Sequence, residues 1–178
     1  MNTELRDAHE TRKPLFFNLL EMVDFVEGEY WRKLGYCQDE IILRQGECSG
    51  SIFLIMEGNA RVLGDMPVGD DYHVRPGMKD LGPGEVFGEY SLLDRGAHSA
   101  TVKAMTPCEL ILIDNEKLLE YLDAHRDLGY QIYRELAVTL VKNLRGSHEK
   151  ILSLLAWGFK VHGYDKYMKH ESYSHHGQ

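Results

Sequence analysis

The feature that most constrains this chain is a series of short apolar runs between residues 34 and 114. They read EIILRQG, SIFLIMEG, NARVLG, LGPGEVFGE, SATVKA and CELILID, with glycines, prolines and polar residues between them. Branched and aromatic residues in runs of this length form strands rather than helices. Many short strands at this spacing are typical of an antiparallel sandwich or barrel, not of a parallel sheet. We therefore expect a mainly β domain over 31–114, with helices on either side of it.

The N-terminal segment, 1–30, contains the run PLFFNLLEMVDFV, which has a helical pattern. Its apolar residues recur at helical spacing behind Pro14: Phe16, Leu19, Leu20, Val23 and Val26. We expect a short amphipathic helix here that packs on the β domain.

The C-terminal segment, 115–160, has the pattern of two helices. Asp114 is a candidate N-cap for the first, NEKLLEYLDAH. A long helix is expected from about Asp127, and its broad apolar stripe is formed by Leu128, Ile132, Tyr133, Leu136, Ala137, Leu140, Val141 and Leu144. One small barrel cannot cover so wide a stripe, which favours a homodimer through 126–146. The alternative is packing within one chain. Residues 161–178 are expected to form a polar tail rich in histidine and tyrosine.

Composition places the chain among cytoplasmic proteins. It has 178 residues, a formal net charge of -8 and three scattered cysteines, Cys37, Cys48 and Cys108. This pattern favours reduced thiols, each a small buried apolar side chain, over a disulfide framework or a metal site. We expect no signal peptide and no membrane helix. Asp70, Asp71 and His73 fall in a hairpin loop, and we interpret both this group and the histidine-rich tail as solvated rather than metal-binding.

The stretch FGEYSLLDRGAHSATVKA, from Phe87 to Ala104, has the pattern of an anion site. Gly88 permits close backbone approach, and Glu89 to Leu93 can form one helical turn whose first N–H groups face an anion. The Glu89 carboxylate would repel a bare phosphate but would accept hydrogen bonds from a sugar hydroxyl beside it. Backbone amides for a phosphate and a carboxylate for a ribose together predict a nucleotide-binding cassette.

This segment resembles the phosphate-binding cassette of the cyclic-nucleotide-binding domain family, which includes catabolite-activator-type regulators and the regulatory subunits of cyclic-nucleotide-dependent kinases. The stretch EIILRQGECSGSIFLIMEGNARVL resembles the family's early strands, and the likeness covers roughly residues 15 to 145. It implies an eight-stranded jelly-roll β-barrel, mainly β with flanking helices, plus a long C-terminal helix. The ligand-binding residues it implies are Gly88, Glu89, Tyr90, Ser91, His98, Ser99, Ala100, Thr101 and Asn143.

One residue departs from the family pattern, because His98 stands where the family carries an arginine that holds the cyclic phosphate. Arginine offers a permanent charge and two aligned donors, whereas histidine offers one donor and a conditional charge. A protonated His98 would bind phosphate more strongly at acidic pH. We interpret Arg95, three residues earlier, as a solvated turn residue.

The sequence therefore leaves two principal functions. In the first, the chain is a regulatory sensor domain that binds cyclic AMP, cyclic GMP or a related anionic ligand and signals through its C-terminal helix to an effector protein. In the second, the site is degenerate and the chain is a dimeric protein-interaction module. An enzyme is disfavoured, since no G-x-S-x-G or similar motif is present. We expect no cofactor, no metal and no direct DNA binding, because about thirty residues follow Gly146 and show no helix-turn-helix pattern.

Overall fold

The computed structural model describes residues 15–68 and 72–163, and these divide between Tyr133 and Arg134 into a first and a second compact unit. The β elements are β1 (Trp31–Tyr36), β2 (Ile41–Leu43), β3 (Ser51–Glu57), β4 (Ala60–Leu63), β5 (Met66–Pro67), β6 (His73–Val74), β7 (Gly77–Leu81), β8 (Val86–Phe87), β9 (Thr101–Ala104) and β10 (Cys108–Asp114). The helices are α1 (Leu15–Leu20), α2 (Glu89–Asp94), α3 (Asn115–Ala124) and α4 (Arg126–Val161).

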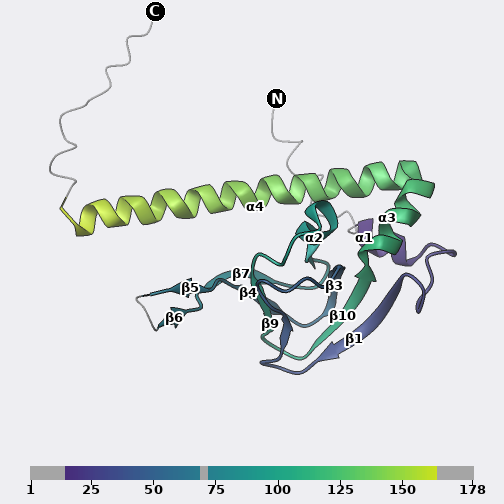
Figure 1. Cartoon of the computed structure of the whole chain (residues 1–178), viewed down its shortest axis with the longest axis horizontal. Helices are drawn as coiled ribbons and strands as arrows, with labels where there is room; N and C mark the ends of the chain where they lie inside the picture. The colour runs from purple at the N-terminus through teal and green to yellow at the C-terminus, as the bar shows by residue number, and fades with distance from the viewer. Residues whose placement is uncertain (1–14, 69–71, 164–178) are drawn as a thin grey trace, which may run out of the picture. The chain divides into compact units, whose positions relative to one another are not determined.

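Eight of these strands form two four-stranded antiparallel sheets, in the orders β1-β10-β3-β8 and β2-β9-β4-β7 (Figure 1). Their inward-facing side chains form one core, with Phe53, Ile55 and Leu110 almost fully buried. This arrangement is the jelly-roll barrel that the family resemblance implied, and it agrees with the antiparallel sandwich or barrel that the short apolar runs predicted. The remaining strands, β5 and β6, pair as a hairpin that extends from β4 and β7, as expected for the loop between Gly64 and Gly82.

The N-terminal helix is shorter than the sequence pattern indicated. Leu15, Phe16 and Leu19 are buried on α1, but the helix ends at Leu20. Val23 is 95% exposed and Val26 is 42% exposed, so their expected place on the buried face was wrong. Phe25 takes the buried position instead, in an aromatic cluster with Tyr30 and Tyr121.

The first helix after the barrel begins where its capping signal indicated, and α4 begins at Arg126, one residue before the expected start. The Asp114 carboxylate accepts a hydrogen bond from the Lys117 N–H at 3.1 Å, which caps α3 as predicted. Of the expected apolar stripe on α4, Ile132 and Leu136 are buried, while Val141 and Leu144 are about half exposed. No helix among the described residues is long and apolar enough to span a membrane.

The cysteines divide between buried and exposed positions. Cys108 is buried at the start of β10, as expected for a small apolar side chain. Cys37 and Cys48 are exposed, so the same expectation was wrong for them, because both lie in turns outside the sheets. All three are free thiols.

Candidate functional site

The cassette begins at Gly88, where the chain turns from β8 into α2. β8 is held against β3 by the register Phe53↔Phe87, and these two rings stack with centroids 5.1 Å apart. Gly88 adopts φ 80°, a left-handed conformation that side chains rarely tolerate. A Cβ atom there would lie 2.9 Å from the Ser51 carbonyl oxygen and 3.4 Å from the Phe53 ring. Only glycine therefore allows this close approach between α2 and β3.

Glu89, the first residue of α2, carries a buried carboxyl group that is only 7% exposed. Burial raises the pKa of Glu89 because the charged form loses its hydration, while the Glu89 backbone N–H and the Lys79 ammonium lower it in part. The Lys79 ammonium itself lies 3.0 Å from Glu85. A buried carboxyl group at this position is a strong hydrogen-bond acceptor for a polar ligand group.

The two residues after Glu89 have different environments. Tyr90 is 39% exposed and lies at the surface of α2. Ser91 is buried, and its hydroxyl donates a hydrogen bond to the Gly88 carbonyl oxygen at 2.8 Å. Ser91 therefore stabilises the turn of the cassette rather than facing solvent. Arg95 ends α2 as an exposed residue with φ 55°, in agreement with a solvated turn.

His98 is buried and tied to the loop that precedes β3. Its exposed fraction is 6%, and its Nε2 lies 2.7 Å from the Ser49 hydroxyl oxygen. Two backbone hydrogen bonds join the same segments, from the His98 N–H to the Glu47 oxygen and from the Gly46 N–H to the His98 oxygen, both 2.9 Å. Burial lowers the pKa of His98, and the Glu47 carboxylate raises it in part. The ring is therefore neutral over a wider pH range than that of a solvated histidine.

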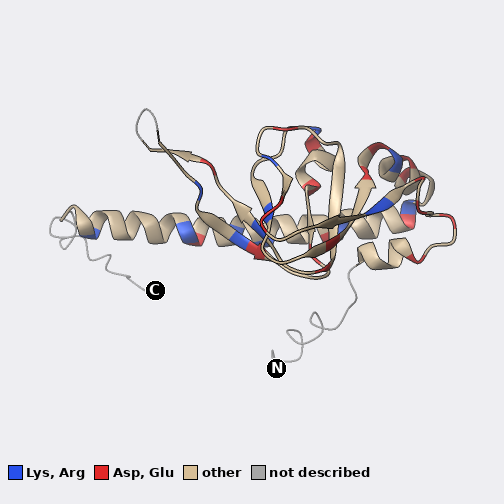
Figure 2. Cartoon of the chain, turned by 90° about the horizontal axis from the view of Figure 1, so that it is seen from below, with Lys and Arg blue, Asp and Glu red and all other residues tan. Residues whose placement is uncertain are grey.

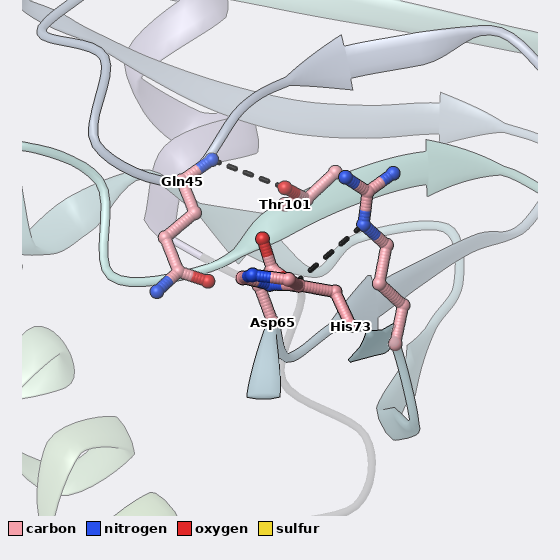
Figure 3. A network of polar contacts seen from close by, with 5 residues as sticks. Gln45, Asp65, His73 and Thr101 are labelled. Carbon is pink, nitrogen blue, oxygen red and sulfur yellow. Dashed lines mark hydrogen bonds and ion pairs between the residues drawn. The ribbon is translucent and has the colours of Figure 1, made fainter. Parts of the chain in front are cut away.

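The end of the cassette leads into β9. Ser99 is exposed and Ala100 is half-buried. The Thr101 hydroxyl oxygen accepts a hydrogen bond from the Gln45 N–H at 3.1 Å (Figure 3). Thr101 thus holds the loop after β2 against the start of β9, and the exposed Ser99 hydroxyl is the cassette's accessible polar side chain at this end.

Asn143 is the one predicted ligand residue outside the first unit. It lies half-buried on α4 in the second unit, where its carbonyl oxygen accepts a hydrogen bond from the Ser147 hydroxyl at 3.0 Å. The other eight predicted residues, 88–91 and 98–101, lie together in the first unit. The contact of Asn143 with a ligand stays a prediction.

Two polar partners of the cassette were missed by sequence reasoning. Ser49 bonds His98 from 49 residues away, and the Asn115 side-chain amide donates to the Ser91 hydroxyl from 24 residues away at 3.0 Å. A serine in a glycine-containing loop and an asparagine at a helix start carry no local signal of such a role.

The described part of the chain holds no group of three or more metal-ligating side chains. Asp70 and Asp71 lie outside the described residues, and His73 is bonded through Nδ1 to Asp65 at 2.9 Å (Figure 3). The histidines of the tail beyond residue 163 also lie outside the described residues.

Acidic residues are spread over the strands and loops of the first unit (Figure 2). Residues 1–133 hold 13 Lys and Arg against 24 Asp and Glu, a formal net charge of -11. An anionic ligand would approach against this field, so the donors that hold it must act at short range.

Comparison with known proteins identifies the family of the chain. Residues 33–125, more than half of the chain, match the family model of the cyclic nucleotide-binding domain. The chain therefore belongs to the cyclic nucleotide-binding domain family, and its fold is the family's jelly-roll barrel.

Two comparisons link the chain to a bacterial regulator of this family. The chain is 35% identical to the cyclic AMP receptor protein of Thermus thermophilus over 133 residues, which are 74% of this chain and 57% of that protein. The crystal structure of the Thermus thermophilus catabolite activator protein matches 83% of this chain and 62% of its own, with a TM-score of 0.62 and 27% identity. This chain thus spans less than two thirds of either relative.

A second solved structure has the same fold. The crystal structure of a cyclic nucleotide-binding domain from Methylobacillus flagellatus matches 70% of this chain and 67% of its own, with a TM-score of 0.62 and 24% identity. At this identity the likeness concerns the fold alone.

Proposed function

We propose that this chain is a regulatory sensor domain that binds a cyclic nucleotide, or a related anionic small ligand, in the cassette from Gly88 to Thr101. The observation that carries the proposal is the pair at the start of α2. Gly88 adopts a left-handed conformation against β3, and Glu89 follows it with a buried carboxyl group. Together they provide backbone donors and a strong acceptor within two residues.

We assign the phosphate and the ribose of a cyclic nucleotide to the cassette and the base to α4. The N–H groups at the start of a helix carry partial positive charge, and we assign those at the start of α2 as the donors for the phosphate. The Glu89 carboxyl group accepts from a ribose hydroxyl, and the exposed Ser99 hydroxyl adds a donor for a phosphate oxygen. Asn143 on α4 is the proposed contact for the base.

His98 changes the strength of this binding. A charge-assisted hydrogen bond contributes about 1.5–3 kcal/mol, and the neutral, buried His98 does not supply one. We therefore expect a dissociation constant about ten- to a hundredfold weaker than an arginine at this position would give. Binding then depends on Glu89 and the backbone amides.

Signalling in this proposal is a shift between two arrangements of the helices that follow β10. A ligand bound more tightly in one arrangement would move α3 and α4, and an effector protein would recognise the change. The role is regulatory rather than enzymatic and needs no cofactor or metal. A homodimer through 126–146, a cytoplasmic location, and the absence of direct DNA or membrane binding complete the proposal.

A second candidate function is favoured by the surroundings of His98. The ring is 6% exposed and its Nε2 is bonded to Ser49. A buried side chain whose ring nitrogen already has a partner is typical of a structural residue rather than of one that contacts a ligand. In this alternative the site is degenerate, and the barrel with its long helix is a dimeric protein-interaction module.

Calorimetric titration with cyclic AMP and cyclic GMP at about pH 6 and about pH 7.5 separates the two functions. We expect micromolar binding by the wild-type protein and its loss in Glu89→Gln, because an amide oxygen is a weaker acceptor than a carboxylate. Glu57→Gln is the matched control, since Glu57 is an exposed carboxylate at the end of β3. No heat at millimolar ligand would favour the interaction module, and binding retained by Glu89→Gln would contradict the assigned role of Glu89.

A further inference from the structure

A buried polar chain connects the cassette helix to the first helix after the barrel. Asn115, the first residue of α3, is 5% exposed, and its Nδ2 donates to the Ser91 hydroxyl oxygen at 3.0 Å. The Ser91 hydroxyl donates in turn to the Gly88 carbonyl oxygen at 2.8 Å. The chain from Asn115 through Ser91 to Gly88, here called the Asn115 relay, thus joins α3 to the residue that opens α2.

The hydrogens of this relay fix the orientation of the Asn115 amide. A serine hydroxyl has a single hydrogen, and Ser91 gives its hydrogen to Gly88, so Ser91 can only accept from Asn115. The Asn115 NH₂ group must therefore face Ser91, and its oxygen must face the other way. That oxygen, Oδ1, is buried and has no hydrogen-bond partner within the described part of the chain.

Neither capping nor packing explains an asparagine here. Asp114 already caps α3 through the Lys117 N–H. The Asn115 backbone N–H is bonded to the Gly50 oxygen at 3.0 Å, which any residue other than proline would allow. A leucine of similar size would fill the same space without leaving a polar atom unpaired. A buried group whose hydrogen bonds are only partly satisfied indicates a role other than stability.

We propose that Asn115 is a positioning residue that holds α2 to α3, so that these two helices move as one. The link to ligand control rests on the proposed function, because in that function α2 binds the ligand. Movement of α2 on binding pulls on α3 through Ser91, and the free Oδ1 provides an acceptor for the rearranged state. The unpaired Oδ1 lowers the stability of the ligand-free fold, and the coupling explains why it is present.

The ligand-free protein tests the relay directly. In Asn115→Leu we expect amide hydrogen exchange at 89–94 to become about tenfold faster, which corresponds to about 1.4 kcal/mol of local protection. The melting temperature should stay the same or rise, because the unpaired oxygen is removed. Glu120→Leu, which places the same leucine on an exposed position of α3, should change neither quantity.

A second variant breaks the relay from the other side. Ser91→Ala should also accelerate exchange at 89–94, and the double variant should exchange no faster than the faster single variant, because both remove one link. If Asn115→Leu lost both exchange protection at 89–94 and melting temperature, Asn115 would be merely a structural residue, and the inference would be overturned. Unchanged exchange, or additive effects, would overturn it as well.

The ligand-bound protein tests the proposed function separately. If wild type binds cyclic AMP, Asn115→Leu should bind about tenfold more weakly, since an α2 released from α3 must become ordered when the ligand binds. Unchanged affinity would contradict the coupling. If wild type binds neither cyclic AMP nor cyclic GMP, the proposed function fails, and the exchange experiment still decides whether α2 is held through Asn115.

Discussion

At the scale of single residues, the cassette combines two groups whose pKa values burial shifts in opposite directions. Burial raises the pKa of Glu89 and lowers the pKa of His98, so both favour the neutral form. The first unit carries a formal net charge of -11, so short-range hydrogen bonds rather than the overall field must hold an anionic ligand. The sequence indicated the histidine, but not its burial, because Ser49 lies 49 residues away along the chain.

The lowered pKa of His98 predicts how stability depends on pH. An unfolded histidine takes up a proton near pH ~6.5, whereas folded His98 takes it up only at lower pH. The unfolded state therefore binds more protons as the pH falls below this value, and the folded state loses stability until the lowered pKa is passed.

We expect this loss to disappear in His98→Gln, whose amide can still bond the Ser49 hydroxyl. Melting temperatures of the two proteins from about pH 7.5 to about pH 5 provide the measurement. The melting temperature of the variant should rise relative to that of the wild-type protein as the pH is lowered. A constant difference would mean that His98 is not buried as neutral imidazole.

At the scale of elements, the strands and the helix caps were predictable and the surroundings of the site were not. Short runs between glycines determine strands through local geometry, so an antiparallel sandwich or barrel followed from the pattern, whereas the jelly roll followed from the family resemblance. The predicted N-terminal helix was too long. Val23 and Val26 fit a helical period in the sequence, but the helix ends at Leu20. Pairs such as His98 with Ser49 depend on tertiary packing, which leaves no period in the sequence.

The turn between β3 and β4 gives a test of these local determinants. Gly58 has φ 86°, and a Cβ atom there would clash with the Pro107 oxygen and lie 2.8 Å from the Cys108 Sγ. Gly58→Ala should cost about 3 kcal/mol or more, because left-handed strain adds to the clash. Gly46 has nearly the same φ, 85°, with nothing within 4 Å of a Cβ atom. Gly46→Ala should therefore cost only about 1–2 kcal/mol, and equal losses in urea unfolding would contradict the role assigned to close approach.

At the scale of the whole molecule, the remaining structural question is what covers the apolar face of α4. Within the second unit, Val141, Leu144, Ile151 and Leu155 are each about half exposed. They recur at spacings of three, four and seven residues, which places them on one side of the helix. A second copy of the same helix is the proposed partner.

We expect Leu144→Glu to convert the dimer to a monomer, because a charge in a helix seam loses its hydration without gaining a partner. Leu144 is a better test position than Leu136, which is 3% exposed in the single chain, so a glutamate there would disturb the chain itself.

Val138 is the matched control: it has the same exposed fraction as Leu144, 56%. It lies six residues earlier, about 120° around the helix. Val138→Glu should leave the mass in solution unchanged, as measured by light scattering during size exclusion. Monomeric wild-type protein at micromolar concentration, or a dimer retained in Leu144→Glu, would contradict this interface and leave α4 to be covered by an effector protein.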